Sequence, residues 1–368
     1  LCVLRMQALC EKYGADRVLA AGDALQDYAE RKMRAGIAAI PDGTYSFTDY
    51  FDSTQMEGEA EFSVAITVAG DTMHLAFDAP PQMRNGLNVI FTALQATCYY
   101  AVKAVIDPTI LPNAGLSRPL TISAPEASML NCRHPAAVNG RIAACQRVAD
   151  IIEGALAKAL PGRVMAAGNG ACTGAVFTGT RDDGSIWVYL ETIGGGSGAR
   201  PDADGLSGVH VHMTNTSNLP VEALELEYPL TLLRYELVDG SGGAGTWRGG
   251  LGMRRVYRVE SECWLSLESS RLNSSPWGLQ GGLPGGRSSF DFGNDSHSAL
   301  GSVQLRAGQV ITIVTPGAGG YGDPAGRAPD AVHRDIIEGR ISQESAEALY
   351  GQVLVSASPG EPQRLRHG

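Results

Sequence analysis

Hydrophobic positions in the first part of the chain recur mostly at the spacing of α-helices. In residues 16–38, for example, Val18, Leu25 and Tyr28 follow a helical period. Glycine and proline mark the points at which such runs stop. Together these patterns predict two helices within 1–40, the second over 16–38, and further helical segments over 86–106, 139–160 and 329–350.

Alternating hydrophobic and polar residues predict β-strands in other segments. The early runs TYSFTDYF, EFSVAITV and TMHLAFDA alternate, and Ala69-Gly70-Asp71 between the last two predicts a hairpin. From about residue 172, short strand-like runs are separated by glycine-rich turns, which is typical of a β-sandwich or barrel-like region. These later runs are AVFTG, SIWVYLETI, ELEYPLTLLRYEL, MRRVYRV, CWLSLES and VITIVT.

This change of pattern predicts an α+β fold class. We expect a helical N-terminal half with a small β-hairpin region, followed by a β-rich half with glycine turns. The corresponding regions are 1–171, 172–325 and 326–368, the last being a helical segment with a loose tail.

The composition is that of a folded chain and argues against nucleic acid and membrane as partners. Of the 368 residues, 44% are hydrophobic and 18% are charged, as in globular domains. The net charge of −10 argues against nucleic-acid binding. No apolar stretch is long enough to span a bilayer, and the start lacks a secretory signal. We therefore expect a cytoplasmic protein whose seven cysteines are free thiols. The start at Leu1, within a helical pattern, indicates a fragment of a longer polypeptide.

The densest group of polar residues and glycines begins at Glu191. Gly194, Gly195 and Gly196 allow the backbone to approach a ligand closely and to present N–H groups to an anion. Arg200 is suited to clamp a carboxylate or a phosphate. The structural alternative is that a glycine-rich loop simply turns the chain.

Two histidines follow in the same segment. His210 and His212 are two residues apart, so on a strand both side chains face one side, as metal ligands and acid–base pairs can require. The structural alternative is that both pack in a core. Spacing alone leaves both interpretations open.

Other motif matches indicate turns rather than sites. Residues 317–322 fit GxGxxG, but Asp323-Pro324 stands where a dinucleotide-binding fold begins a helix. The sequence contains no GxxxxGK[ST] run and no complete GxSxG. The chain therefore has neither a P-loop nor a hydrolase nucleophile elbow.

Four glycine-rich motifs occur in one order: GGGSGARPDADGLSGVHVHMTNTSNLPVE, SGGAGTWRGGLG, PWGLQGG and TPGAGGYGDP. That order resembles the hydantoinase B/oxoprolinase family, which includes B-type subunits of acetone and acetophenone carboxylases. The earlier segments PDGTYSFTDYFD and ACQRVADIIEGALAKALP agree. The resemblance covers essentially the whole chain.

The resemblance implies a subunit of an ATP-dependent enzyme that hydrolyses a hydantoin, 5-oxoproline or a lactam through a phosphorylated carbonyl. The alternatives are a subunit of an ATP-dependent ketone carboxylase and a non-catalytic scaffold chain. ATP and Mg²⁺ are expected on an A-type partner chain. A second partner would carry the N-terminal B region, and a divalent metal such as Zn²⁺ or Mn²⁺ would have its ligands outside this chain.

The same resemblance, combined with the chemistry of the side chains, assigns residue roles. Where the family often has a basic residue after MTNT, this chain has Ser217-Asn218, so substrate contacts there differ. Metal ligands in this chain stay unassigned. The expected catalytic residues are His210, His212, Asn215 and Arg200, and the expected substrate-binding residues are Gly194, Gly195, Gly196 and Asp204.

Overall fold

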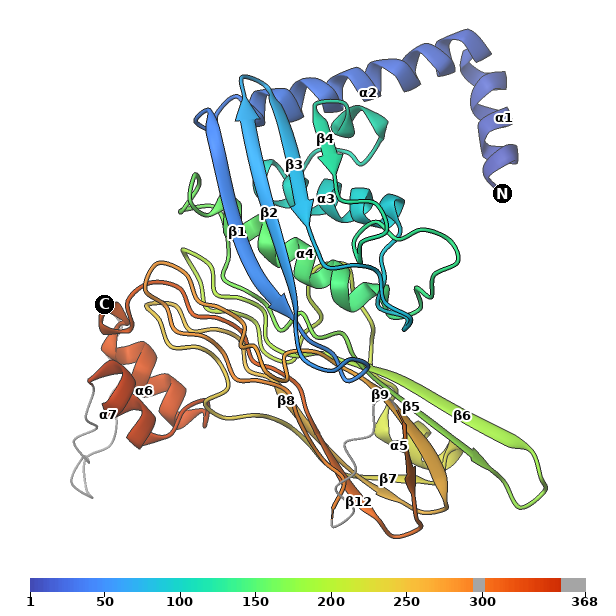
Figure 1. Cartoon of the computed structure of the whole chain (residues 1–368), viewed down its shortest axis with the longest axis vertical. Helices are drawn as coiled ribbons and strands as arrows, with labels where there is room; N and C mark the ends of the chain where they lie inside the picture. The colour runs from blue at the N-terminus through green and yellow to red at the C-terminus, as the bar shows by residue number, and fades with distance from the viewer. Residues whose placement is uncertain (294–301, 352–368) are drawn as a thin grey trace.

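The computed structural model describes residues 1–293 and 302–351 and confirms the α+β fold class. Figure 1 shows a sheet with helices at one end of the molecule and a β-rich region at the other, with a band of irregular chain between them. Among the described residues, no helix is long and apolar enough to cross a membrane.

A four-stranded sheet and the helices that pack on it form the first half. The predicted hairpin is confirmed, because β2 and β3 are antiparallel with Ala69 opposite Thr72. The fourth strand lies parallel to β3, which the sequence pattern did not predict. The strand order is β1 (Gly43–Phe51), β2 (Ala60–Ala69), β3 (Thr72–Asp78) and β4 (Leu120–Ser123).

Helices cover this sheet and share a hydrophobic core with it. Two helices, α1 (Cys2–Tyr13) and α2 (Ala15–Ile37), confirm the pair predicted within 1–40. The end of α2 joins α3 (Phe91–Ile106) and α4 (Arg141–Leu156) in this core. The prediction that α3 starts at residue 86 was wrong, because Val89 instead exchanges backbone hydrogen bonds with Met129 and Cys132 in an extended conformation.

The second half contains two four-stranded sheets whose inner faces share one core, as in a sandwich. One sheet has the order β11-β9-β5-β6 and the other the order β10-β12-β8-β7. The strands are β5 (Thr173–Thr180), β6 (Ile186–Ile193), β7 (Leu230–Leu237), β8 (Met253–Val259), β9 (Cys263–Glu268), β10 (Ser289–Asp291), β11 (Ser302–Leu305) and β12 (Val310–Val314).

Two sequence patterns in this half divide differently from the prediction. The run 225–237 is not one strand, because α5 (Val221–Glu227) precedes β7 and buries Leu224. The C-terminal helical segment is two helices, α6 (Pro329–Ile337) and α7 (Gln343–Tyr350). Gly339, with a φ of +67°, lies between them in a conformation that an L-residue rarely adopts.

Four glycine-rich segments form the band between the two halves and bond to one another through backbone atoms. The Gly196 amide donates to Pro316 and the Ala318 amide donates to Gly250. A Cβ atom at Gly196 would lie 2.1 Å from the Gly250 oxygen, so only glycine permits this approach. The boundary proposed at residue 171 stays a prediction, because Ala166 already bonds to this band. The segments are 194–208, 241–252, 276–286 and 315–322.

Candidate functional site

Three charged side chains lie along one face of α4 although the helix is buried along most of its length. Arg147, Asp150 and Glu153 are three residues apart, a spacing that makes successive side chains neighbours on a helix. Each residue is 3% exposed or less. Because a buried charge without a partner is strongly unfavourable, each requires a group of opposite charge from another element.

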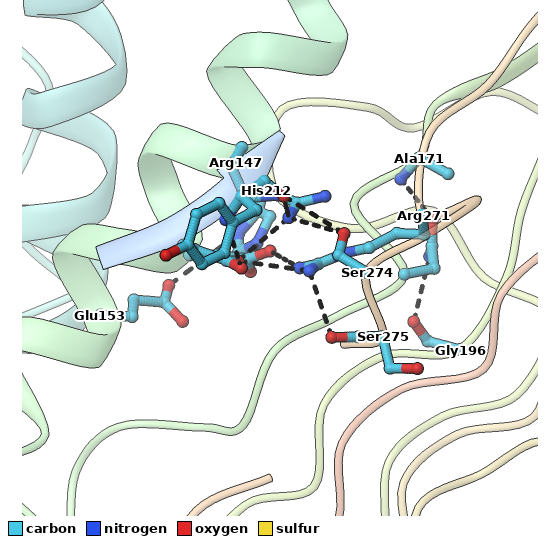
Figure 2. A network of polar contacts seen from close by, with 12 residues as sticks. Arg147, Glu153, Ala171, Gly196, His212, Arg271, Ser274 and Ser275 are labelled. Atoms are coloured by element: carbon cyan, nitrogen blue, oxygen red, sulfur yellow. Dashed lines mark hydrogen bonds and ion pairs between the residues drawn. The ribbon is translucent and has the colours of Figure 1, made fainter. Parts of the chain in front are cut away.

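Their partners come from β1 and from the segment that follows β9. The Asp49 carboxylate accepts hydrogen bonds from Arg147 Nη1 at 3.1 Å and from Arg271 Nη1 at 3.2 Å. Arg271 Nη2 donates to Asp150 Oδ2 at 2.7 Å. Figure 2 shows Arg147 and Arg271 converging on this network from α4 and from the opposite chain segment. Buried ion pairs therefore connect the two halves of the molecule.

His212 completes the network from the histidine-containing segment. Its Nε2 atom lies 2.9 Å from Asp150 Oδ1, and its Nδ1 atom lies 3.9 Å from Glu153 Oε1. The side chain is 0% exposed. The backbone of His212 has a φ of +51°, in the left-handed region, so this part of the chain is a turn and not the strand considered in the sequence analysis.

Burial and neighbouring charges shift the pKa values within this cluster. Burial raises the pKa of Glu153 to about 7, and the Asp150 charge acts in the same direction. Burial alone would lower the pKa of His212, but the hydrogen bond to Asp150 and the Glu153 charge raise it. Burial would likewise raise the pKa of Asp150, yet His212 and Arg271 lower it. Glu153 can therefore hold a proton near neutral pH while Asp150 stays ionised.

Backbone contacts connect the network to the glycine-rich band. Asn169 donates to the Gly196 oxygen twice, from its amide at 2.8 Å and from Nδ2 at 3.0 Å. Asp52 accepts the Arg271 amide at 2.6 Å, where Arg271 has a φ of +62°. The turn that presents Arg271 is thus held by a buried carboxylate.

The three predicted substrate-binding glycines are packed against other backbone segments. The Gly195 amide donates to Val209 at 2.9 Å and the Gly196 amide donates to Pro316 at 3.1 Å. The Gly194 oxygen accepts from Thr315 Oγ1 at 2.7 Å. The amides of Gly195 and Gly196 are therefore occupied within the chain and do not point to a ligand here.

Arg200 and Asp204 lie apart from the histidines. Gly195 and Val209 pair at the base of a loop whose tip is the Arg200–Ala203 bridge. Four residues lie between Gly195 and Arg200 on one side of this loop, and five lie between Ala203 and Val209 on the other. Arg200 is exposed at this tip, 3.5 Å from Asp202.

Asp204 is bound by other groups of the chain. Its two oxygens accept from Arg327 Nη1 at 2.7 Å and Nη2 at 2.8 Å, and the Arg248 amide also donates to it. Arg327 continues to Asp335 of α6 at 2.6 Å. The structure therefore places Asp204 in a second ion-pair network that holds the C-terminal helices.

Of the two remaining predicted catalytic residues, His210 is partly buried and Asn215 is exposed. His210 is partly buried beside the backbone of Thr192, and its Nε2 atom is itself buried and has no hydrogen-bond partner in the described part of the chain. Burial lowers the pKa of His210 below its ordinary value, against the effect of the Thr192 backbone. Asn215 is exposed. The segment thus holds one buried, ion-paired histidine, and one partly buried, neutral histidine whose Nε2 atom has no partner among the described residues.

The family of the chain follows from comparison with known sequences. The sequence model of the hydantoinase B/oxoprolinase family matches residues 1–324. The chain belongs to the hydantoinase B/oxoprolinase family. Within this family, a putative B-type subunit of a D-/L-hydantoinase from Pseudomonas sp. strain NS671 is 31% identical over 371 residues. That alignment covers 95% of this chain and 62% of the relative, so the chain spans less than two thirds of the relative's length.

Two further proteins share the fold of this hydantoinase B family chain. The caprolactamase β subunit of Pseudomonas jessenii is 28% identical over 94% of this chain and 63% of its own length. The crystal structure of that ATP-dependent caprolactamase superposes with a TM-score of 0.80 at 24% identity, covering 95% of this chain and 63% of the solved chain. Nucleotide-free acetone carboxylase superposes with a TM-score of 0.84 at 19% identity, covering 96% of this chain and 55% of the solved chain.

The described residues of this family member do not gather metal ligands. Over 1–293 and 302–351, no three His, Cys, Asp or Glu side chains are placed to hold an ion. Asp150, the carboxylate nearest to His212, is bonded to Arg271, which would repel a cation. The chemistry of these side chains fits an ion-pair network and not a metal site.

The charged residues of α4 were not singled out from the sequence. The segment 139–160 was predicted only as a helix, and Arg147, Asp150 and Glu153 were given no role. A usable signal was present: charges three residues apart in a helix whose remaining positions are mostly small or apolar indicate a buried polar stripe.

Proposed function

We propose that this chain is part of a B-type subunit of an ATP-dependent enzyme that hydrolyses a cyclic amide: a hydantoin, 5-oxoproline or a lactam. The observation that carries the proposal is the 31% identity to a putative hydantoinase B-type subunit over 95% of the chain. The likeness to a caprolactamase β subunit supports the same reaction class.

ATP and Mg²⁺ are assigned in this proposal to a separate A-type chain, and a divalent metal such as Zn²⁺ or Mn²⁺ to ligands outside this chain. A further chain carrying the N-terminal B region is the second expected partner. The sequence has no P-loop, and Gly317 and Gly319 of the GxGxxG match are packed against other backbone segments, which supports the assignment of ATP.

The proposed reaction needs proton transfer after ATP has activated the ring carbonyl. The amide oxygen takes the γ-phosphoryl group and ADP leaves, so that water can attack the carbonyl carbon. Loss of phosphate and cleavage of the ring C–N bond then give a carboxylate and an amine, whose nitrogen must receive a proton. His210 is the better candidate for this transfer because its ring is neutral and its Nε2 atom has no partner among the described residues.

His212, Asn215 and Arg200 take different parts in this proposal. His212 acts as a positioning residue, since its buried bond to Asp150 fixes the turn that carries His210. Asn215 is exposed two residues past that turn and is assigned to the substrate carbonyl. Arg200, at the loop tip, contacts substrate or phosphoryl group only if the partner chain closes on it.

The test is turnover of the complex reconstituted with its A-type chain. We expect ATP-dependent hydrolysis of a cyclic amide, and a fall of about 10²–10⁴-fold in kcat for His210→Ala, the range typical of a lost general acid–base. His333→Ala, an exposed histidine on α6, is the matched control and keeps wild-type turnover. Wild-type turnover in an assembled His210→Ala complex contradicts this role and favours the scaffold alternative.

Ketone carboxylation is the competing reaction class. The likeness to acetone carboxylase is high in fold but only 19% in sequence, so it concerns architecture alone. If the complex incorporates labelled bicarbonate into a ketone and hydrolyses no amide, the proposed reaction is carboxylation and not hydrolysis. The family assignment is unchanged by that result.

A further inference from the structure

The outer part of the N-terminal helices projects from the molecule as an arm, defined here as α1 and residues 15–25 of α2. No residue of α1 is buried, and the first buried residue of α2 is Ala29. Figure 1 shows α1 bent away from the end of α2, with no other labelled element beside it. A helix of 12 residues is marginally stable in water by itself. Among the described residues, the arm therefore lacks the packing that would stabilise it.

One side of α1 carries an apolar stripe. Its residues follow one another at intervals of four, three and four, as in the seam of a coiled coil. Met6 is 53% exposed and Leu9 is 44% exposed. An exposed row of large apolar side chains marks a surface that contacts another polypeptide. The stripe consists of Cys2, Met6, Leu9 and Tyr13.

A second apolar stripe runs along α2 and continues the buried side of that helix into the arm. Ala29 and Met33 of this side pack in the hydrophobic core. Leu25 and Val18 precede Ala29 by four and eleven residues, separations that keep them on the same side of a helix. Leu25 is 49% exposed. The arm thus offers a second surface of the same kind.

The connection between the helices prevents the two stripes from covering each other within one chain. Gly14 alone separates α1 from α2, and its φ is +85°. Two helices pack antiparallel through a loop of about 2–5 residues, so one residue is too short for α1 to fold back along α2. The α2 stripe of a second copy is free of this constraint.

Charged side chains of opposite sign flank the two stripes. Arg5 and Lys12 of α1 are seven residues apart and lie on one side of their helix. Asp16 and Asp23 of α2 have the same separation. All four side chains are exposed and form no ion pair within the part of the chain that the structure describes. Because the separations are equal, the α1 pair of one copy can face the α2 pair of another.

The two kinds of contact have different effects. Exposed ion pairs contribute about 0–1 kcal/mol each, so they determine register and partner choice. The apolar stripes provide most of the affinity, because their side chains leave water on association.

We propose that the arm is a dimerisation surface: α1 of one copy packs along residues 15–25 of α2 in a second copy, and α1 of the second copy packs in the same way on the first. Each contact then occurs twice around a two-fold axis, which closes the assembly at two copies. The proposal concerns the assembly of this chain with itself and is independent of the reaction proposed above.

The mass of the chain in solution tests the proposal. Sedimentation velocity of residues 1–368 at tens of micromolar should give the mass of a dimer. A reducing buffer is required because Cys2 is exposed and Cys10 is partly exposed, so that oxidation can cross-link copies without the proposed contact. A monomer at this concentration overturns the proposal and leaves the arm to a different polypeptide.

A matched pair of leucine variants locates the contact. Leu9→Asp places a charge in the α1 stripe and should raise the dimer Kd by at least ~10-fold. Leu226→Asp, at an exposed leucine on α5 in the β-rich half, should leave the Kd unchanged. Because α1 buries no residue, Leu9→Asp leaves the rest of the chain folded, which circular dichroism checks. An unchanged Kd in Leu9→Asp places any dimer contact elsewhere and overturns the proposal.

Charge reversal identifies what occupies the α2 stripe. Arg5→Glu together with Lys12→Glu should raise the Kd by ~10-fold or more in low-salt buffer, because like-charged pairs replace the ion pairs. Adding Asp16→Lys and Asp23→Lys to the same chain reverses both members of each pair and should restore the wild-type Kd. A wild-type Kd in the double variant, or no recovery in the fourfold variant, overturns the assignment of α2 as the docking surface of α1.

Discussion

At the scale of single residues, the α4 cluster shows why the His212 side chain is wholly buried while His210 is only partly buried. His212 is surrounded by Asp150 and Glu153, and Arg271 bonds to the far side of Asp150. His210, two residues earlier, lies beside the Thr192 backbone and is partly exposed to solvent. The left-handed backbone at His212 separates the two environments. Sequence spacing left open whether the two histidines form a site or pack in a core, and it could not show this turn, because non-glycine residues rarely adopt it.

The buried carboxyl of Glu153 makes folding stability depend on pH. Its pKa rises from 4.5 to about 7 on folding, so the folded state binds a proton that the unfolded state has lost within that window. Stability contributed by this group is therefore complete below pH 4.5 and is lost as pH rises through 7, by roughly 3 kcal/mol in total. Urea unfolding measures the free energy of unfolding at pH 5 and at pH 8. The decrease between these pH values should be smaller in Glu153→Gln than in the wild type by about this amount.

Exposed Glu222→Gln on α5 is the control for this comparison and should keep the wild-type pH dependence. His212, whose pKa is also raised, contributes in the same direction, and because the Glu153 charge is one cause of that rise, Glu153→Gln reduces the His212 contribution as well. An equal change in stability between pH 5 and pH 8 in wild type and Glu153→Gln would show that Glu153 is ionised in the folded state at both pH values.

At the scale of elements, periodic patterns identified most helices and strands, and contacts distant in sequence decided the rest. Alternation identified β1, β2 and β3, whereas β4 has only four residues and exists because it pairs with β3. Local signals likewise could not place α5, which starts after Pro220 and is fixed by burial of Leu224. The ion pairs of α4 depend on Asp49 and Arg271, which are remote in sequence.

Replacing glycine by alanine should change the free energy of unfolding in opposite directions at two positions, one in the glycine-rich band and one in a helix. Gly196→Ala places a methyl group 2.1 Å from the Gly250 oxygen, so the backbone must move, and we expect a loss of more than ~3 kcal/mol in the free energy of unfolding. Gly22→Ala lies in helix α2 with nothing within 4 Å, and should stabilise by up to ~1 kcal/mol. Chemical denaturation measures both. A tolerated alanine at residue 196 would show that the segments are not packed as described.

At the scale of the whole molecule, the described residues form two large hydrophobic cores, joined by ion pairs and by the glycine-rich band, and a small third core at the C-terminal helices. The helical layer and the β-sandwich each bury their own apolar side chains. Between them, the GxGxxG match at 317–322 is packed against neighbouring backbone, and it leads into a short 3₁₀ helix at Pro324–Gly326 and not into the long helix of a dinucleotide fold.

The isolated chain should therefore not bind nucleotide. Calorimetric titration of residues 1–368 with Mg-ATP should give no measurable heat of binding, while the A-type chain, titrated in parallel, should bind. The reason is that the proposed division of labour places the phosphate-binding loop on the partner. Tight ATP binding by this chain alone would require a nucleotide site that its sequence motifs do not reveal, and would contradict that division.

The backbone bonding of the glycine-rich band also bears on how the chain folds. Its segments come from four separate stretches between residues 194 and 322, and they bond to one another across the gaps between those stretches. Contacts of such long sequence separation form late, because loop-closure entropy is lost before any contact can compensate for it. During synthesis, the helical layer can form first. The backbone amides of the band stay unpaired until the last glycine-rich segment has been synthesised. Nascent and truncated chains are thus the forms most prone to aggregate.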